Sequence, residues 1–297
     1  MVNQATTCKR CGSDSVTVRF RLRDTHVNRC KRCGLHFLPD LDNLGTADVS
    51  ELDDTLREYI AHELQSNLIR FPPKLDLIES AQPLDGARVM DIGAGGGIFL
   101  HLAQQRGASV DGIEPVQSRR QFAKEKYALD LREEAIETAV DPERDRGAFD
   151  VVTAWDVIEH VNDPFGFMET MATLTKPGGV VAFDTPARDG LLYRLAALEH
   201  DLTRGRSARL MRAMYSPMPF CHKQILSREH LRDAFLSRGF RDVRCELVTE
   251  LSFPTHYYLV RIFRSKRLAG ALDLIVKRLM PLIPLHNKVV GVFQRVE

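Results

Sequence analysis

The sequence has no strong excess of either charge and no long uninterrupted hydrophobic run. Lysine and arginine total 41 and aspartate and glutamate total 40, a net charge of +1 over 297 residues. Nucleic-acid-binding domains are usually strongly basic, so nucleic acid is an unlikely main partner. The most hydrophobic late stretch, residues 268–285, is broken by two prolines and three charged residues and is too short to span a bilayer. The first residues lack the hydrophobic core of a signal peptide, and we expect a cytoplasmic protein.

The G-x-G-x-x-G fingerprint of dinucleotide-binding proteins is also missing, although a glycine-rich turn is present. Residues 89–97 read Val-Met-Asp-Ile-Gly-Ala-Gly-Gly-Gly, and the fingerprint would need glycine where Ile98 stands. Glycine lacks a β-carbon, so a ligand can approach this backbone closely. An acid just before the turn would serve a ligand with an α-ammonium group, such as S-adenosylmethionine, better than a pyrophosphate. The candidate cofactor contacts here are Asp91, Gly93, Ala94, Gly95 and Gly97.

Strand-like and helix-like segments alternate on both sides of this turn. Strands are predicted at 88–92, 109–113, 149–154 and 180–184, with a short one at 129–132 and a last one at 288–296; helices are predicted at 98–105, 118–127 and 165–174. This rhythm predicts an α/β fold with a doubly wound, Rossmann-like parallel sheet. Ligands of such sheets bind at the carboxyl ends of the strands. Glu114 follows the second strand, where its carboxylate would accept hydrogen bonds from ribose hydroxyls.

Four of the six cysteines form two identical pentapeptides, Cys-Lys-Arg-Cys-Gly. Their spacing, C-x₂-C twice with an 18-residue gap, is that of a zinc ribbon, so we expect one structural zinc ion bound by Cys8, Cys11, Cys30 and Cys33. A segment of about 40 residues buries too little apolar surface to fold alone, and a bound ion would supply the missing stability. The surface of this segment is locally basic, which indicates either an anionic partner or an ordinary solvated face.

Three regions follow from these patterns. We expect a zinc-binding ribbon at 1–45, a linker and lid helices at 46–82, and the main domain at 83–297, with insertions at about 186–221 and 253–286. A helix that begins near Ser50 is predicted to stop at Pro72-Pro73, and a second helix is predicted to follow it. Both insertions mix arginine and lysine with large apolar residues. This mixture predicts amphipathic helices that act either as lids or as a contact with a membrane surface.

Several motifs in order resemble class I S-adenosylmethionine-dependent methyltransferases, in the branch of ubiquinone-biosynthesis-like and sugar methyltransferases. Residues 89–97 resemble the cofactor glycine loop, and 112–115 (Gly-Ile-Glu-Pro) resemble the ribose-binding strand end. The fourth strand and its loop are matched by 149–152 and 156–164, and the approach to the fifth strand by 174–179. Residues 222–227 with 238–240 (Arg-Gly-Phe) resemble the tail of the branch. The resemblance covers about half of the chain.

The resemblance implies a methyltransferase domain that binds S-adenosylmethionine. It places the methionine end of the cofactor near Asp91, Gly93, Trp155 and Asp156, the ribose at Glu114, and adenine between Pro115 and a loop at Ala135 and Ile136. Many relatives have an aspartate in the adenine loop, whereas this chain has Glu-Glu-Ala-Ile-Glu at 133–137.

A hydroxyl acceptor must lose a proton when it is methylated, and histidine is the side chain with a suitable pKa. His160, after the fourth strand, and His222, in the tail, are the candidate bases, although each is also compatible with a purely structural role. The leading hypothesis is methyl transfer to a small-molecule hydroxyl, of a sugar, a lipid-linked glycan or a secondary metabolite. The alternatives are an RNA methyltransferase that uses the basic ribbon and a non-catalytic zinc-binding scaffold.

Overall fold

The glycine-rich segment lies between a strand and a helix in the computed structural model, as the sequence predicts. The structure describes residues 7–23, 25–39, 54–133, 145–215, 222–252, 254–279 and 282–296. Through the middle of the chain the elements alternate in this order: β4 (Arg88–Ile92), α2 (Ile98–Gln104), β5 (Ser109–Ile113), α3 (Gln117–Tyr127), β6 (Phe149–Trp155), α5 (Pro164–Leu174) and β7 (Thr175–Pro186). The predicted α/β, Rossmann-like class is therefore confirmed.

These four strands join β9 (Phe240–Val248) and β10 (Lys288–Arg295) in a six-stranded sheet of order β5-β4-β6-β7-β10-β9. The first four strands are parallel, whereas β10 runs antiparallel to both β7 and β9. The prediction of a parallel sheet is thus wrong for the last two strands, because apolar runs do not encode strand direction. The short strand predicted at 129–132 is reduced to one parallel bridge between Arg132 and Ile113.

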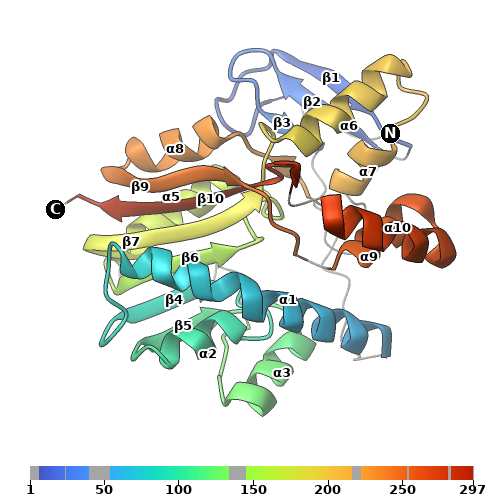
Figure 1. Cartoon of the computed structure of the whole chain (residues 1–297). Coiled ribbons are helices and arrows are strands. Elements are labelled where there is room, and N and C mark those ends of the chain that lie inside the picture. The colour runs from blue at the N-terminus through green and yellow to red at the C-terminus, as the bar shows by residue number, and fades with distance from the viewer. Residues whose placement is uncertain are drawn as a thin grey trace.

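Helices cover both faces of the sheet. On one face lie α1 (Asp54–Glu79), α2 and α3, and on the other lie α5 and α8 (Arg228–Leu236), as Figure 1 shows. Phe71 and Ile78 of α1 pack with Phe99 of α2 in the buried core of the first face. The second core contains Met168 of α5 and Phe235 of α8. The sheet is thus the middle one of three layers. Because β4, β5, β6 and β7 are parallel, their carboxyl ends meet at one edge of it.

Helix α1 does not end at Pro72-Pro73, contrary to the prediction. It continues through both prolines to Glu79, although an interior proline lacks a donor and costs about 3 kcal/mol. Buried contacts on both sides of the prolines compensate for this cost. Arg70 and Lys74, one turn apart, both contact the carboxylate of Asp184. Tertiary contacts therefore outweigh the local preference.

The N-terminal cysteine segment forms part of a second sheet. Its strands β1 (Val16–Arg21), β2 (His26–Cys30) and β3 (His36–Phe37) are followed in the sheet by β8 (Gln224–Ile225), which comes from late in the chain. All neighbouring strands are antiparallel. We call residues 7–39 the ribbon. The ribbon is therefore joined by backbone hydrogen bonds to the segment that follows His222.

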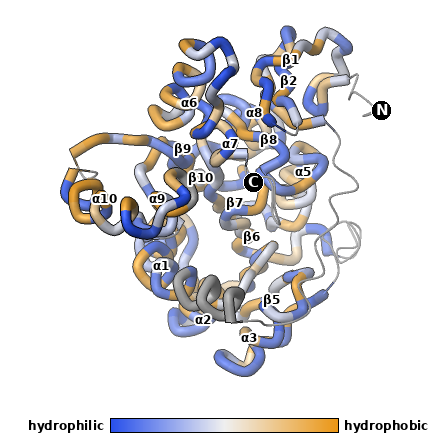
Figure 2. Tube along the Cα trace, turned by 90° about the vertical axis from the view of Figure 1, so that its right-hand side faces the viewer, coloured by the Kyte–Doolittle hydropathy of each residue, from blue (hydrophilic) through white to orange (hydrophobic). Residues whose placement is uncertain are grey.

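Both predicted insertions are helical. The first contains α6 (Leu191–Leu202) and α7 (Arg209–Tyr215), and the second contains α9 (Thr255–Phe263) and α10 (Lys266–Leu279). Helix α6 packs on the ribbon, where the Tyr193 hydroxyl lies 2.8 Å from His36 Nδ1. Figure 2 shows hydrophobic and hydrophilic residues interspersed along α10. Among the described residues, no helix is both long and apolar enough to cross a membrane.

Candidate active site

The turn after β4 has a backbone that only glycine adopts easily. Gly93, Gly95 and Gly97 have φ values of 76°, 55° and 80°, all in the left-handed region. Gly97 is the residue before α2 begins, and Ala94 is nearly buried between the glycines. The turn therefore presents main-chain atoms at the start of a helix, where the sequence predicts the cofactor.

Glu114 is buried at the carboxyl end of β5 and supports the glycine turn directly. The backbone N–H of Gly95 donates to its Oε2 at 2.8 Å, and that of Val116 donates to its Oε1 at 2.9 Å. Burial raises the pKa of Glu114 above its ordinary value. Pro115, beside it, is exposed. Each carboxylate oxygen retains a lone pair for a further donor, so the geometry is compatible with the expected ribose contact.

Asp91 lies on β4 and is almost completely buried. Thr153 Oγ1 on β6 donates to its Oδ1 at 2.7 Å. Burial raises the pKa of Asp91 to about 7, and the neighbouring charge of Glu114 acts in the same direction. A buried carboxylate without a cation is unfavourable, so an incoming ammonium group would stabilise its charged form.

Trp155 is the last residue of β6 and Asp156 follows it, and their side chains make different contacts. The indole of Trp155 packs against Phe71 and Phe99 in the first core, and its Nε1 has no hydrogen-bond partner among the described residues. Asp156 has a φ of 54°, which is unusual for a residue with a side chain. Its carboxylate pairs with Lys288 at 2.5 Å and accepts a hydrogen bond from Ser252 at 2.9 Å. The predicted contacts of both residues with the cofactor stay predictions.

Asp156 belongs to a buried network of three cations and three anions, which we call the ion cluster. It comprises Arg70, Lys74, Asp156, Asp184, Glu250 and Lys288. The cations hold the pKa of Asp184 well below its usual range despite its complete burial. The cluster joins α1 to the carboxyl ends of β6 and β7. Sequence reasoning missed it, although the i, i+4 spacing of Arg70 and Lys74 indicated that they share a helix face.

The two predicted bases lie side by side, with ring centroids 4.9 Å apart. One ligand atom from each of His160, His222 and Glu159 lies within 4.8 Å of the others, a geometry that could also hold a metal ion. Thr185 Oγ1 donates to Glu159 Oε2 at 2.8 Å, whereas Glu159 Oε1 and His222 Nδ1 are buried without a hydrogen-bond partner in the described structure. Burial raises the pKa of Glu159 to about 8 and lowers that of His222 to about 3.

The predicted adenine-loop residues, Ala135 and Ile136, lie outside the described residues, so their assignment stays a prediction. Of the linker and lid helices predicted at 46–82, residues 46–53 also lie outside the described residues.

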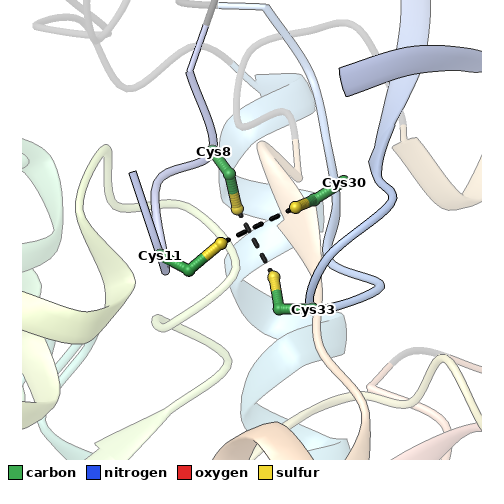
Figure 3. A group of neighbouring side chains, drawn as sticks. All are labelled: Cys8, Cys11, Cys30 and Cys33. Atoms are coloured by element: carbon green, nitrogen blue, oxygen red, sulfur yellow. Dashed lines mark hydrogen bonds between the residues drawn. The ribbon is translucent and has the colours of Figure 1, made fainter. Parts of the chain in front are cut away.

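The four cysteines of the two pentapeptides come together as predicted. Figure 3 shows their sulfur atoms pointing toward one common centre, with Cys8 and Cys33 Sγ 3.5 Å apart and Cys11 and Cys30 Sγ 3.7 Å apart. A tetrahedral zinc site with Zn–S bonds of about 2.3 Å separates its sulfurs by about 3.8 Å, so the cluster fits that ion. Burial would raise the pKa of Cys30, but backbone N–H groups of Cys33 and Arg32 outweigh it and lower the pKa to about 7.

A glycine turn flanked by two buried carboxylates at the carboxyl edge of a Rossmann-like sheet defines a nucleoside-cofactor-binding α/β protein. Comparison with known proteins is more specific. The family model described as a methyltransferase domain matches residues 56–244. The chain belongs to this methyltransferase family.

Curated relatives of this chain carry the description ubiquinone biosynthesis O-methyltransferase. The protein from Ralstonia nicotianae is 40% identical over 132 residues, which cover 43% of this chain but only 55% of the relative. The protein from Chromobacterium violaceum is 33% identical over 166 residues, or 51% of this chain and 70% of the relative. The chain thus spans about half the length of the first relative.

A solved S-adenosylmethionine-dependent methyltransferase from Archaeoglobus fulgidus has a similar fold. It superposes with a TM-score of 0.51 at 17% identity, over 79% of this chain and 94% of that one. At this identity, the likeness concerns the fold alone.

Proposed function

We propose that the protein transfers the methyl group of S-adenosylmethionine to a hydroxyl group of a small molecule. Asp91 would bind the ammonium group of the cofactor, Glu114 the ribose hydroxyls, and the glycine turn the methionine end. The acceptor oxygen attacks the methyl carbon in line as the S–CH₃ bond breaks, which leaves S-adenosylhomocysteine. Because the sulfonium is already a good leaving group, the protein mainly orients the acceptor and accepts its proton.

The observation that carries this proposal is a pair of buried polar side chains, Glu159 in the loop after β6 and His222 just before β8. Glu159 Oε1 and His222 Nδ1 are buried without a hydrogen-bond partner in the described structure, and His160 lies beside them. A buried polar atom without a partner is costly, so a bound hydroxyl group would stabilise this arrangement. His222, with a pKa of about 3, is a weak base, so we assign the role of proton acceptor to His160, whose ring centroid lies 4.9 Å away.

The names of the relatives, rather than the geometry of the site, support one class of acceptor. The relatives are named for an O-methylation in ubiquinone biosynthesis, which favours an aromatic hydroxyl over the sugar and glycan hydroxyls that the sequence also suggested. An aromatic hydroxyl is more acidic than an alcohol, and a neutral histidine can take its proton more readily.

Product analysis tests the proposal. The purified protein is incubated with S-adenosylmethionine and matched panels of catechols, sugars and polyprenyl-linked sugars, and methylated products are measured by mass spectrometry. We expect O-methylated catechols. His160→Ala should slow transfer by about 10²–10⁴-fold while cofactor affinity is kept. Failure to methylate any hydroxyl, or a His160→Ala variant of unchanged rate, would contradict the proposal.

We propose further that α10 and the segment at Leu282 contact an anionic membrane, which would give access to a lipid-linked acceptor. Large apolar side chains are exposed there, with Leu274 80% and Leu282 77% accessible. They are accompanied by the basic residues Lys266, Arg267, Lys277 and Arg278. An apolar face beside basic side chains suits the surface of an anionic bilayer. A lid that closes over the acceptor is the alternative.

Vesicle co-sedimentation separates the two possibilities. Binding to phosphatidylglycerol vesicles that is weakened by Leu274→Glu and by salt supports the membrane contact. Equal recovery in the supernatant with and without vesicles favours the lid.

A further inference from the structure

The last strand of the ribbon, β3, contacts the part of the proposed site that would bind the acceptor, which contains Glu159, His160 and His222. In the β3–β8 pair, His36 is opposite Ile225 and Phe37 is opposite Gln224. The next residue of the ribbon, Leu38, donates its N–H to Lys223 O at 2.7 Å. Strand β8 begins two residues after His222. The edge of the ribbon therefore fixes the backbone that carries this histidine.

The same segment holds the loop that carries the other histidine. The Lys223 N–H donates to Glu159 O at 2.7 Å. Gln224 is completely buried, and its Nε2 donates to Ile158 O at 2.8 Å and to Val161 O at 2.9 Å. One side chain next to β3 thus spans the turn at 158–161, on which Glu159 and His160 lie.

The two cysteine pentapeptides, residues 8–12 and 30–34, are called the knuckles below, and the second knuckle contacts the helix that follows β8. His230 completes the capping box at the start of α8, and its Nε2 lies 2.9 Å from Cys33 O. Arg188, after β7, donates to the backbone oxygen of Gly34. Cys8 and Cys30 share one buried core with Ile158 and Leu226. The knuckle is consequently packed into the main domain.

The cofactor side is supported by different elements. Gly95 is held by Glu114, which follows β5, and Arg119 of α3 pairs with Glu63 of α1 at 3.1 Å beside the same turn. Asp91 is held by Thr153 of β6. We therefore expect a change in the ribbon to displace the two histidines more than it displaces the glycine turn.

We infer that the zinc-loaded ribbon is a positioning module for the acceptor half of the site, and that Gln224 is the positioning residue that transmits the order of the ribbon to His160 and His222. This inference rests on the proposed function and assigns a role to the ribbon within it. Bound zinc fixes the two knuckles, the knuckles fix β3, β3 fixes β8, and Gln224 fixes the 158–161 turn. Loss of the metal or of the Gln224 side chain should misalign the acceptor and its base while cofactor binding persists.

The test compares three variants of the 297-residue chain, each purified in the presence of zinc. Gln224→Ala removes both hydrogen bonds to the turn, and Cys33→Ser weakens the metal site. Arg19→Ala is the matched control, because it breaks a contact of the ribbon with α6, the 2.7 Å ion pair with Asp201, which lies away from β8. Zinc content, thermal unfolding, affinity for S-adenosylmethionine, kcat, and the imidazole NMR resonances of His160 and His222 are measured for each.

For Gln224→Ala we expect kcat to fall at least tenfold, with one zinc retained and cofactor affinity within twofold of the parent. The resonances of both histidines should move. Cys33→Ser should show the same pattern with reduced zinc, and excess zinc should restore part of the rate. Arg19→Ala should match the parent. The inference is overturned if Gln224→Ala and Cys33→Ser leave the histidine resonances unchanged, or if cofactor affinity falls as steeply as kcat in both.

The imidazole resonances need no acceptor, so they separate this inference from the proposed function. If the parent methylates no hydroxyl but both variants shift the resonances of the two histidines, the positioning role holds and the proposed reaction fails. If the parent is active and the resonances and kcat do not respond, the reaction holds and the positioning role fails.

Discussion

Gly93 and Val157 lie so close together that a side chain at Gly93 has no room. A β-carbon built on Gly93 would lie 2.6 Å from Val157 Cγ2, well inside van der Waals contact. Val157 is in the segment between Asp156 and the Glu159–His160 pair. The glycine turn and the loop that leads to Glu159 and His160 therefore touch at this point, and glycine is required at position 93 both by its φ and by its neighbour.

Two alanine substitutions separate the effect of the positive φ from that of the clash with Val157. Gly86 has a similar φ of 74° but nothing within 4 Å of the position that a β-carbon would take, whereas Gly93 has both the positive φ and the clash. We expect Gly86→Ala to destabilise the fold by about 1 kcal/mol and Gly93→Ala by an additional 1–3 kcal/mol or so from overpacking. Urea denaturation measures both. Adding Val157→Ala to Gly93→Ala should recover much of the difference, and equal effects of the two single substitutions would contradict the steric argument.

The placement of the glycine turn beside the two buried carboxylates could be predicted because its signals are local. Asp91 and the glycines are adjacent in sequence, and Glu114 follows the next strand, so the alternation of strands and helices was enough to bring them together. The cysteine cluster was predictable for a similar reason, since each pentapeptide supplies two ligands at a fixed spacing.

The ion cluster and the β3–β8 pair could not be predicted in the same way. Arg70 reaches Glu250, 180 positions away, and His36 pairs with a strand near residue 225. No local pattern specifies such partners. Pro72 and Pro73 misled the prediction for the same reason: their effect on the helix is local, whereas the contacts of Arg70 and Lys74 that maintain α1 are distant in sequence.

Asp91→Asn should weaken binding of S-adenosylmethionine and remove its pH dependence. Burial raises the pKa of Asp91 to about 7. The proposed contact with the ammonium group of the cofactor requires the charged carboxylate. Affinity of the parent should therefore fall as the pH drops below 7, because binding must then release a proton, and should level off above it. Loss of a charged hydrogen bond worth about 1.5–3 kcal/mol predicts a reduction of about 10- to 100-fold at pH 8. Calorimetry from pH 5.5 to 8.5 checks both; an asparagine variant with the slope of the parent would exclude this role.

Arg70→Met should destabilise the protein strongly, because it leaves Asp184 and Glu250 short of a partner inside the fold. Removing one partner of a buried ion pair typically costs about 3–5 kcal/mol. Arg106 offers a control on the surface, where it pairs with Asp76 and Glu79. Arg106→Met should change the unfolding free energy by less than about 1 kcal/mol. Chemical denaturation of the two variants compares these values, and similar losses in both would show that the cluster contributes no more than a surface pair.

Glu159→Gln should change how stability depends on pH. Burial raises the pKa of Glu159 to about 8, so its carboxyl is protonated in the folded protein at neutral pH but ionised in the unfolded chain. A raised folded-state pKa gives stabilisation that is complete below the unfolded value, near 4.5, and is lost as the pH rises through 8. The unfolding free energy of the parent should therefore fall between pH 5 and pH 8 more steeply than that of Glu159→Gln, which mimics the neutral acid at every pH.

Urea denaturation at pH 5, 6.5 and 8 measures the two slopes. Asp91 contributes to both proteins alike, so the difference isolates Glu159, and parallel slopes would mean that Glu159 is already ionised at neutral pH in the folded state.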